Sequence, residues 1–370
     1  MKQLRVIQVG YGTVGGAVLE QIADHRAAWR ARLELDVFVV AFGGRAGAIC
    51  VDIENGIDDD ECRERVRQRR DGVDDDSAHS DWEAVISASV AQGPTIVMDA
   101  AAGEETASLD VAALEQGAGV VLSNKAPLAL PLDDPRRAVL WAEARSDGRL
   151  RYEATVGAGL PVISMLHTLL DSSDEMLEIT GMLSGTFGAI FSDVASGTPF
   201  SEAVRTAKEA GFTEPDPRDD LSGLDVARKA LILARTTGHQ LDLTGIDVRS
   251  FVPDDLAEGS IDEFLDGLDR MNDEIDTMAS DARAGGGVMK YVASVDARGA
   301  VTVKLQSVSK GTVMGALTGP ENVVSFRTER YDQYPTVVSG PGAGAAVTAA
   351  GMIGDMLRLG QSLGQEDFRR

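Results

Sequence analysis

Cysteine and lysine are scarce in this chain of 370 residues. Cysteine occurs twice, and lysine accounts for seven of the 35 basic residues. Cys50 and Cys62 match no metal-binding or redox spacing, so we expect a reduced, cytoplasmic protein. The four histidines form neither an HExxH motif nor a ligand pair, which argues against catalytic zinc.

Long apolar runs are also missing. No run of 18 apolar residues exists, and the first residues, MKQLRVIQVG, have no apolar signal-peptide core. The sequence therefore predicts neither a membrane span nor a signal peptide. No GxxxxGK[ST] motif occurs, which excludes a P-loop. Ser307–Lys310 matches SxxK, but it ends an alternating strand and lacks the partner motifs, so chance explains it.

Acidic residues dominate the charge. The 59 acids give a net charge of −24, which disfavours nucleic acid as a partner because no basic cluster outweighs it. Such charge keeps a protein soluble in concentrated salt, and a high-salt, halophilic source is the resulting hypothesis. The length suits two domains.

A glycine turn opens the chain between a predicted strand, Leu4–Val9, and an amphipathic helix. In Gly10-Tyr11-Gly12-Thr13-Val14-Gly15 the first glycine permits a tight turn and the second lets the backbone approach a pyrophosphate. The third lets helix and strand pack closely. The sequence therefore predicts a dinucleotide site on the helix N-terminus.

The end of the second predicted strand, Leu35–Phe42, indicates which cofactor is used. A dinucleotide fold places its ribose-reading group here, and the chain offers Gly43, Gly44 and Arg45 in place of a carboxylate. A cation suits a 2′-phosphate, which favours NADP(H) over NAD. Alternatively, Arg45 stacks on adenine at the surface.

Two further strand patterns, at 95–106 and 119–130, end on the ligand side of a parallel sheet. Lys125 lies within the second pattern, just past its strand, and it is either a ligand-side lysine or a surface-loop lysine. Residues 54–92 are rich in acids and arginines and predict a solvated helix with flanking loops.

The second half opens with a strand pattern carrying Glu153, which breaks at Gly157–Gly159 before a helix that starts near Pro161. Backbone carbonyls near a carboxylate could hold a small cation. Residues 178–197 predict a strand, a turn of small residues and a helix. Residues 337–360 predict a glycine-rich loop and a helix, where Gly342 and Gly344 either approach a cofactor or cap the helix.

The most concentrated chemistry lies in FTEPDPRDDLSGLDVARKALILAR, residues 212–235. Two prolines stiffen the loop, and Ser222–Asp225 fits a helix start with Asp225 at the third position. Asp225 and Lys229 then share a face, which points inward because residues 230–234 are aliphatic. An inward lysine is held for pairing or for proton transfer.

Several of these segments together resemble homoserine dehydrogenase over nearly the whole chain. They are VGYGTVGG, SNK, YEATVGAGLPVI, SGTFGAIFSDV, GFTEPDPRDDLSGLDVARKALIL and GPGAGAAVTAAGMIGDML. The resemblance implies an α/β fold, with a Rossmann-type NAD(P)-binding domain at 1–150 and an α+β catalytic and dimerisation domain at 151–339. The C-terminal helix, about 340–362, would complete the first domain of a homodimer.

The implied reaction is reversible hydride transfer between L-homoserine and L-aspartate 4-semialdehyde with NAD(P), a step in threonine and methionine biosynthesis. Lys229 and Lys125 match the family's catalytic lysines. Lys229, held by Asp225, is the predicted acid/base, and Lys125 would orient the reacting oxygen. The remaining implied residues are Glu214, Asp220, Gly185 and Thr186 for substrate, and Glu153 with the carbonyls of Val156, Ala158 and Leu160 for a structural sodium ion. The predicted cofactor contacts are Gly10, Gly12, Thr13, Val14, Gly15, Arg45, Ala100, Ser123, Lys125, Gly342 and Gly344.

The chain departs from the family pattern in places. Phe212 stands where tyrosine is common, and Ala100-Ala101-Ala102 replace the usual hydroxyl residues after the strand ending at Asp99. Ending at Arg370, the chain is expected to lack an amino-acid-sensing domain. Two alternatives remain: a dehydrogenase of another short amino-alcohol or semialdehyde, and a non-catalytic NADP-binding sensor. Aspartate-semialdehyde dehydrogenase is disfavoured because neither cysteine lies near a proposed site.

Overall fold

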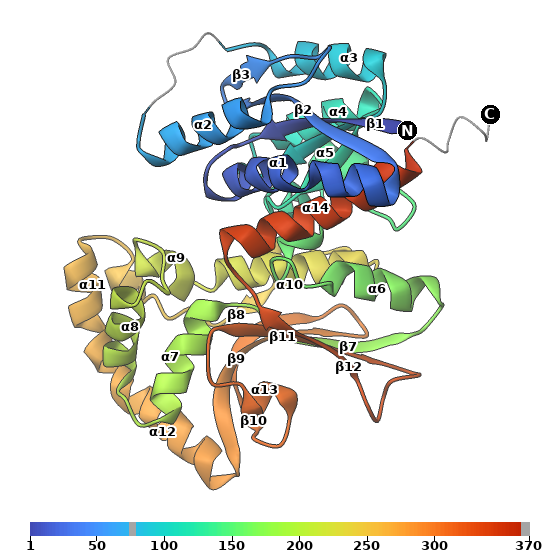
Figure 1. The fold of residues 1–370 in the computed structure, drawn as a ribbon. Coiled ribbons are helices and arrows are strands. Elements are labelled where there is room, and N and C mark those ends of the chain that lie inside the picture. Colours follow the sequence, from blue (N-terminus) through green and yellow to red (C-terminus); the bar gives the residue numbers. More distant parts are fainter. Residues whose placement is uncertain (74–78, 364–370) are drawn as a thin grey trace. The chain divides into compact units, whose positions relative to one another are not determined.

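The computed structural model describes residues 1–73 and 79–363, which divide into two compact units (Figure 1). The first unit contains residues 1–167 and returns at Ala343, and the second contains Thr168–Gly342. Over the described ranges, every helix is too short or too polar to cross a membrane.

The first unit is built on a six-stranded sheet in the order β3-β2-β1-β4-β5-β6. All neighbouring strands are parallel except β2 and β3, which form an antiparallel pair. The strand order reverses between β1 and β4, and such a switch point is where open α/β sheets bind ligands. This is the predicted Rossmann-type arrangement. The strands are β1 (Lys2–Val9), β2 (Leu35–Gly44), β3 (Gly47–Val51), β4 (Thr95–Asp99), β5 (Gly119–Leu122) and β6 (Leu150–Arg151).

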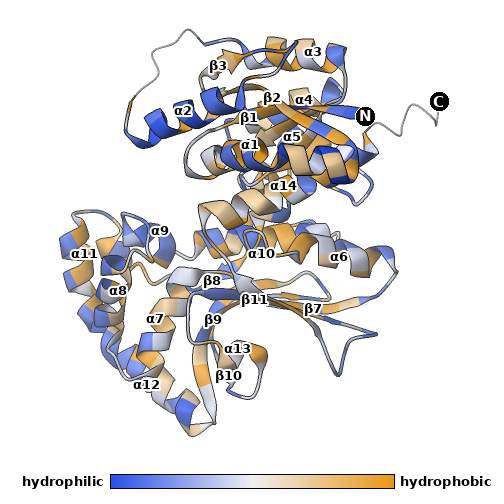
Figure 2. Cartoon of the chain, viewed as in Figure 1, coloured by the Kyte–Doolittle hydropathy of each residue, from blue (hydrophilic) through white to orange (hydrophobic). Residues whose placement is uncertain are grey.

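Helices connect these strands. The acidic and arginine-rich segment forms α2, which is largely hydrophilic (Figure 2). The prediction of one solvated helix was wrong for the later part of this region, because a second helix, α3, buries Trp82, Val85 and Ile86. The helices are α1 (Thr13–Leu33), α2 (Asp59–Arg70), α3 (Trp82–Gln92), α4 (Ala107–Glu115), α5 (Pro135–Glu143), α6 (Val162–Asp171) and α14 (Ala345–Ser362), with short 3-10 turns η1 (Pro127–Ala129) and η2 (Glu153–Thr155).

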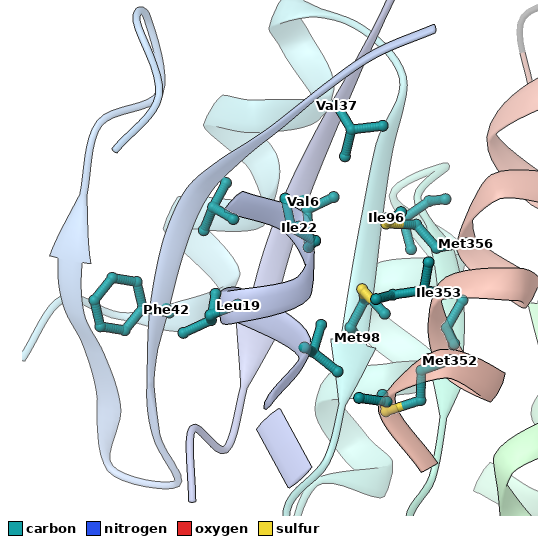
Figure 3. Close-up of a cluster of buried hydrophobic side chains, with 14 of the residues drawn as sticks. Val6, Leu19, Ile22, Val37, Phe42, Ile96, Met98, Met352, Ile353 and Met356 are labelled. Atoms are coloured by element: carbon teal, nitrogen blue, oxygen red, sulfur yellow. The ribbon is translucent and has the colours of Figure 1, made fainter. Parts of the chain in front are cut away.

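The C-terminal helix α14 completes the core of the first unit. Its apolar residues Met352, Ile353 and Met356 join side chains from β1, α1, β2 and β4 in one buried cluster (Figure 3). Met352 and Met356 are fully buried. Burying such a side chain contributes about 1.5–3 kcal/mol, so the sheet depends on a helix that arrives last in the sequence.

Glu153 does not lie on a strand, contrary to the prediction. Strand β6 ends at Arg151, and Glu153 begins the turn η2. Its backbone N–H donates to the Asp355 carboxylate on α14 at 2.8 Å, and its own carboxylate accepts from Ile163 N at 2.7 Å. These contacts take the chain out of the sheet and fix Glu153 against the start of α6.

The second unit contains a six-stranded sheet in the order β12-β11-β7-β9-β10-β8, antiparallel except between β8 and β10. Phe187, Phe191, Phe200, Phe251 and Tyr291 form an aromatic cluster between this sheet and its helices. The strands are β7 (Met176–Met182), β8 (Asp247–Val248), β9 (Gly287–Asp296), β10 (Val301–Ser309), β11 (Glu321–Thr328) and β12 (Thr336–Pro341). The helices are α7 (Gly185–Ala195), α8 (Phe200–Glu209), α9 (Pro217–Leu221), α10 (Leu224–Thr236), α11 (Ile261–Gly267), α12 (Asn272–Ala284) and α13 (Val313–Ala316), with 3-10 turns η3 (Leu243–Gly245), η4 (Asp254–Leu256) and η5 (Leu268–Met271).

The proline-rich acidic loop is more ordered than its sequence indicates. Pro217 is the first residue of the short helix α9, whose N-terminus the Asp216 side chain caps. Helix α10 begins at Leu224 after Gly223, which has a left-handed φ of 75°. The predicted start at Ser222 was therefore wrong, and Asp225 is the second helical residue. A glycine takes this conformation without steric strain, which lets two helices follow each other directly.

Candidate active site

Helix α10 places a lysine and a carboxylate on one face. Lys229 Nζ lies 2.8 Å from Asp225 Oδ2 and donates to the carbonyl oxygen of Leu183 at 2.6 Å. The Lys229 side chain is 12% exposed, whereas that of Asp225 is 44% exposed. The half-buried lysine is thus held by two partners, and the more open Asp225 carboxylate faces solvent, from which a ligand could arrive.

Two other predicted substrate residues, Thr186 and Glu214, meet at Asp220. Its Oδ1 accepts from the Thr186 hydroxyl at 2.9 Å, and its Oδ2 accepts from the backbone N–H of Glu214 at 2.7 Å. Thr186 is also within 2.6 Å of the Phe212 carbonyl oxygen, so one hydroxyl proton serves two acceptors. Asp220 thereby joins the acidic loop to the first turn of α7.

The turn that begins α7 connects these two groups. Leu183 accepts from Lys229, and three residues later Thr186 bonds to Asp220, with Gly185 between them. Gly185 is the first residue of α7, and the Ser184 side chain caps that helix. The structure thus brings Lys229, Asp225, Asp220, Thr186 and Gly185 together within the second unit, and Glu214 follows as an exposed residue of the same loop.

The pKa of the Asp220 carboxyl is raised above its ordinary value. Burial raises its pKa, and the charges of Asp225 and Asp219 act in the same direction, while the hydrogen bonds from Glu214 and Thr186 oppose the shift. A partly buried carboxylate next to others is stabilised by an incoming cation. The second unit therefore offers an acidic site for a positively charged group.

Asp216 supports the loop and does not face this cluster. Its carboxylate makes a bidentate pair with the Arg218 guanidinium, at 3.0 and 2.6 Å, which holds the pKa of Asp216 below its ordinary value. Arg218 also donates to the carbonyl oxygens of Ala257 and Gly259 at 3.2 Å. This brace fixes α9, from which Asp220 projects.

The glycine turn of the first unit has the form that its sequence predicts. Gly10 has φ of 76° and lies so close to Ala100 and Ala101 that a Cβ would fall 2.8 Å from the backbone nitrogen of Ala101. A Cβ on Gly15 would overlap the carbonyl oxygen of Gly10. The turn and the helix start consequently pack backbone against backbone, which no other residue type permits.

The N-terminus of α1 is open to a ligand. Gly12 is its N-cap, no side chain caps it, and space for a Cβ on Gly12 is free of atoms for 4 Å. Thr13 and Val14 form the first turn, which contains no acidic residue. An uncapped helix end with a positive dipole fits a pyrophosphate, so the residues present suit the predicted dinucleotide.

Ala100 and Ser123 lie at the ends of neighbouring strands in the same sheet. Ala100 N donates to the Val9 carbonyl oxygen at 2.9 Å, and Ser123 N donates to that of Asp99 at 3.0 Å. The partly buried Lys125 follows two residues after Ser123 and precedes η1. These positions lie at the carboxyl ends of β4 and β5, on the ligand side of the sheet.

Arg45 directly follows β2 and is exposed. Its guanidinium lies 3.5 Å from the carboxylate of Glu105, and the two side chains are 62% and 63% exposed. An ion pair this exposed contributes about 0–1 kcal/mol, so Arg45 can exchange Glu105 for a phosphate at little cost.

The two later glycines frame the start of α14. Gly342 follows β12, and Gly344 is the N-cap of α14, with no side-chain cap. Gly344 therefore occupies the N-cap position, one of the two roles that the sequence allowed. Because glycine has no side chain to accept from them, the first backbone N–H groups of α14 have no side-chain cap.

The residues around Glu153 suit a small cation. The backbone turns sharply at Gly157 and Ala158, with φ of 80° and 56°. As far as the structure is described, the carbonyl oxygens of Val156 and Ala158 accept no hydrogen bond, whereas that of Leu160 accepts from Val162 N at 2.8 Å. Two carbonyls without donors beside a buried carboxylate match the oxygen ligands that a hard cation prefers.

Four residues that contact or neighbour the predicted site residues were not predicted from the sequence: Leu183, Asp99, Thr106 and Asn124. The carbonyl of Leu183 holds Lys229, and Asp99, Thr106 and Asn124 form a buried group beside Ser123. A backbone carbonyl that accepts a hydrogen bond cannot be identified from the residue type, because every residue has one. Asn124 was visible within SNK, but nothing local indicated which groups its side chain would bind.

Comparisons with known proteins agree with this arrangement. A family model described as homoserine dehydrogenase matches residues 161–357, and one described as the NAD-binding domain of homoserine dehydrogenase matches residues 10–153. The Schizosaccharomyces pombe homoserine dehydrogenase is 34% identical over 364 residues, covering 96% of this chain and 95% of the yeast protein.

Longer relatives match as well. Bifunctional aspartokinase/homoserine dehydrogenase 1 of Arabidopsis thaliana is 39% identical over 360 residues, covering 96% of this chain. This chain spans 38% of the length of that plant protein.

Solved structures share the fold. A Candida auris protein of unknown function superposes with a TM-score of 0.86 at 30% identity, covering 98% of this chain and 99% of that one. A hyperthermophilic archaeal homoserine dehydrogenase in complex with NADPH superposes with a TM-score of 0.70 at 23% identity, covering 96% and 97%.

Proposed function

Because the chain belongs to the homoserine dehydrogenase family, we propose that it catalyses the reversible, NAD(P)-dependent interconversion of L-homoserine and L-aspartate 4-semialdehyde, a step in threonine and methionine biosynthesis. The observation that carries this proposal is the contact of Lys229 with Asp225 and the Leu183 carbonyl, in the same unit as the Asp220 cluster. A half-buried lysine paired with Asp225, near the Asp220 carboxylate, combines a proton-transfer group with a binding site for an ammonium group.

The acidic loop would bind the amino group of the substrate. Homoserine carries an ammonium, and Asp220, Glu214 and Asp225 supply negative charge around the first turn of α7. Asp220 is already oriented by Thr186 and by the Glu214 backbone, so its carboxylate needs little rearrangement to accept a further N–H. Charge-assisted hydrogen bonds of this kind are about twice as strong as neutral ones.

Lys229 would move the proton. Oxidation of the hydroxyl needs a proton acceptor, and reduction of the aldehyde needs a donor. Asp225 pairs with the ammonium form of Lys229, and the Leu183 carbonyl fixes the direction of Nζ. Positioned general acids and bases contribute about 10²–10⁴-fold to rate. We assign Lys125 to orienting the reacting oxygen.

The first unit would bind the cofactor through the glycine turn and the open end of α1. NAD(P) supplies or accepts the hydride when bound. Ala100, Ser123, Gly342 and Gly344 would contact it through the backbone or a short side chain. Arg45 supports NADP over NAD, since it stands where NAD-specific folds carry a carboxylate.

A structural sodium ion is a further part of the proposal. Glu153 and the carbonyls of Val156, Ala158 and Leu160 would hold it, supported by the two carbonyls without donors. The Glu153 carboxylate also accepts from Ile163 N and Ser164 N at the start of α6, so a cation here would fix η2 against that helix.

We also propose that the chain forms a homodimer through a catalytic and dimerisation domain, residues 151–339, with residues 1–150 and the C-terminal helix as the nucleotide domain. Exposed apolar side chains support this: Val313 is 50%, Tyr331 44% and Tyr334 76% exposed. Strand β12 is an edge of its sheet, and bare edges invite pairing. Solution mass at several salt concentrations tests the dimer.

The deciding experiment is NADPH oxidation by the full chain with L-aspartate 4-semialdehyde, measured in low salt and in molar salt. Turnover in either buffer supports the enzyme. Cofactor binding without turnover in both buffers would instead favour a non-catalytic NADP-binding sensor. Turnover with another short semialdehyde but not with this one would point to a related dehydrogenase.

A further inference from the structure

A buried polar cluster joins the two loops of the first unit that are predicted to meet the cofactor. Asp99 ends β4 and is fully buried, Thr106 directly precedes α4, and Asn124 follows β5. Thr106 is 4% and Asn124 7% exposed. Most polar groups this buried have hydrogen-bond partners, and the contacts of these three residues define one arrangement.

Asp99 is the centre of the cluster. Its Oδ1 accepts from Ala101 N at 2.7 Å, and its Oδ2 accepts from the Thr106 hydroxyl at 2.7 Å and from Asn124 Nδ2 at 3.1 Å. Its backbone carbonyl accepts from Ser123 N at 3.0 Å. One residue thus fixes the loop after β4 and the segment after β5.

Asn124 extends these contacts around Lys125. Its Nδ2 donates to the Gly103 carbonyl oxygen at 2.7 Å, and its Oδ1 accepts from Ala126 N at 3.1 Å. The second bond closes a turn across Lys125, the kind of local bond by which asparagine shapes a loop. The backbone of Lys125 is therefore held on its N-terminal side through Ser123 and Asn124 and on its C-terminal side through Ala126.

Burial raises the pKa of the Asp99 carboxyl, whereas the hydrogen bonds from Thr106, Ala101 and Asn124 oppose that shift, and a second buried carboxyl group lies on α4. Asp110, in the first turn of α4, is fully buried, and neither of its oxygens has a hydrogen-bond partner within the described residues. Burial and the charge of Asp99 both raise the pKa of Asp110. Asp99 differs from Asp110 in having three donors directed at its carboxyl, so Asp99 is the group that orders the surrounding loops.

We propose that Asn124 and Asp99 are positioning residues for the reaction, which set the direction of Lys125 and the place of Ser123 without touching the substrate. This inference rests on the proposed function. A misplacement of about 1 Å in a reacting group costs about 10²-fold in rate, so a loosened turn should act on turnover more than on binding.

The test compares Asn124→Ala with Asn272→Ala in the full chain. Asn272 lies in the second unit and is likewise held through both ends of its side-chain amide, by two hydrogen bonds to Ser201. We expect Asn124→Ala to lower kcat about 10- to 100-fold while KM for aspartate semialdehyde stays within about twofold. Asn272→Ala should lower the unfolding midpoint by a similar amount and leave kcat unchanged.

A second readout does not depend on turnover. The rate at which acetic anhydride labels Lys125, followed by mass spectrometry, should change several-fold in Asn124→Ala, with Lys229 as the internal reference. Unchanged labelling of Lys125 together with unchanged kcat would overturn the proposal. Absence of turnover in the unmodified chain would defeat the proposed function alone, because labelling still reports the position of Lys125.

A conservative variant covers the case in which Asn124→Ala does not fold. Asn124→Ser keeps an oxygen that can accept from Ala126 N but loses the amide that reaches Gly103 and Asp99. It should label and turn over at rates between those of the unmodified chain and those of a fully loosened turn. Wild-type values for both measurements in Asn124→Ser would reduce Asn124 to a structural role.

Discussion

Lys229 and Asp225 lie one helical turn apart on α10, with 2.8 Å between Nζ and Oδ2, and the same Nζ donates to the Leu183 carbonyl at 2.6 Å. The lysine is thus held from two directions, by its own helix and by the residue before the α7 turn. Surface lysines of an i,i+4 pair keep many rotamers, whereas this one keeps few. The arrangement suits a group that must present its proton at one place.

Replacement of Lys229 by methionine should lower kcat about 10²–10⁴-fold and leave the affinity for NADPH unchanged, because methionine keeps the apolar stem and removes the acid/base. Steady-state kinetics and a nucleotide titration measure this. Lys208→Met is the matched control. Lys208 is partly exposed and likewise donates to a backbone carbonyl, that of Pro215 in the acidic loop, at 2.9 Å. Normal turnover in Lys229→Met would refute the assigned role.

Thr186→Val should raise KM for homoserine and lower the free energy of unfolding. The hydroxyl is the donor for both the Phe212 carbonyl and Asp220 Oδ1, and valine has the same shape without it. Loss of such a buried donor costs about 1–3 kcal/mol. Thr237→Val, which removes a hydroxyl bonded to the Ala234 carbonyl, is the control. An unchanged KM with reduced stability would limit Thr186 to a structural role.

Arg45→Ala should lower kcat/KM for NADPH about 10- to 100-fold and leave that for NADH nearly unchanged, because a guanidinium–phosphate contact is a strong charge-assisted bond. The NADPH/NADH ratio of kcat/KM is the measurement. Glu105→Gln removes the competing carboxylate at 3.5 Å and should keep or raise the ratio. If the ratio does not move in Arg45→Ala, Arg45 lies outside the cofactor site.

Asp110 should make the protein less stable as pH rises. Its folded-state pKa is raised well above the ordinary value of 3.8. Below the ordinary pKa of 3.8 the carboxyl is protonated in both the folded and the unfolded chain. Above 3.8 the unfolded chain releases its proton first, so the free energy of unfolding falls with rising pH until the folded carboxyl also ionises. Asp110→Asn, which does not titrate, should gain stability over the unmodified chain by up to about 1.4 kcal/mol per pH unit in that window.

Urea unfolding at pH 5 and at pH 8 measures this difference. Asp147→Asn is the control, because the Asp147 side chain is 80% exposed and its replacement should shift both measurements equally. A constant difference between Asp110→Asn and the unmodified chain at the two pH values would show that Asp110 ionises as readily folded as unfolded.

The parts of the fold that local rules determine were predictable. The glycine turn needs neighbours no further away than Gly10 and Gly15, and the inward face of Lys229 follows from the aliphatic residues around it. The predicted fold class and the family are confirmed. The roles of the individual site residues stay predictions.

The errors share a physical cause, which is contact between distant residues. Glu153 leaves the sheet because Asp355, 202 residues later, binds its N–H. Helix α9 forms where a loop was expected because Arg218 reaches the carbonyls near Gly259. No prediction was made for Asp110, which is fully buried within the segment ASLDVAALE.

The position of α14 at the end of the sequence delays completion of the first unit's core during synthesis. The core of the first unit needs Met352, Ile353 and Met356, but the 175 residues of Thr168–Gly342 must leave the ribosome before they appear. At about 5–20 residues per second, that interval lasts roughly 9–35 s. Throughout it, the nucleotide-binding half exposes the apolar surface that α14 later covers. We therefore expect the growing chain to depend on a chaperone that covers this apolar surface until α14 has been synthesised.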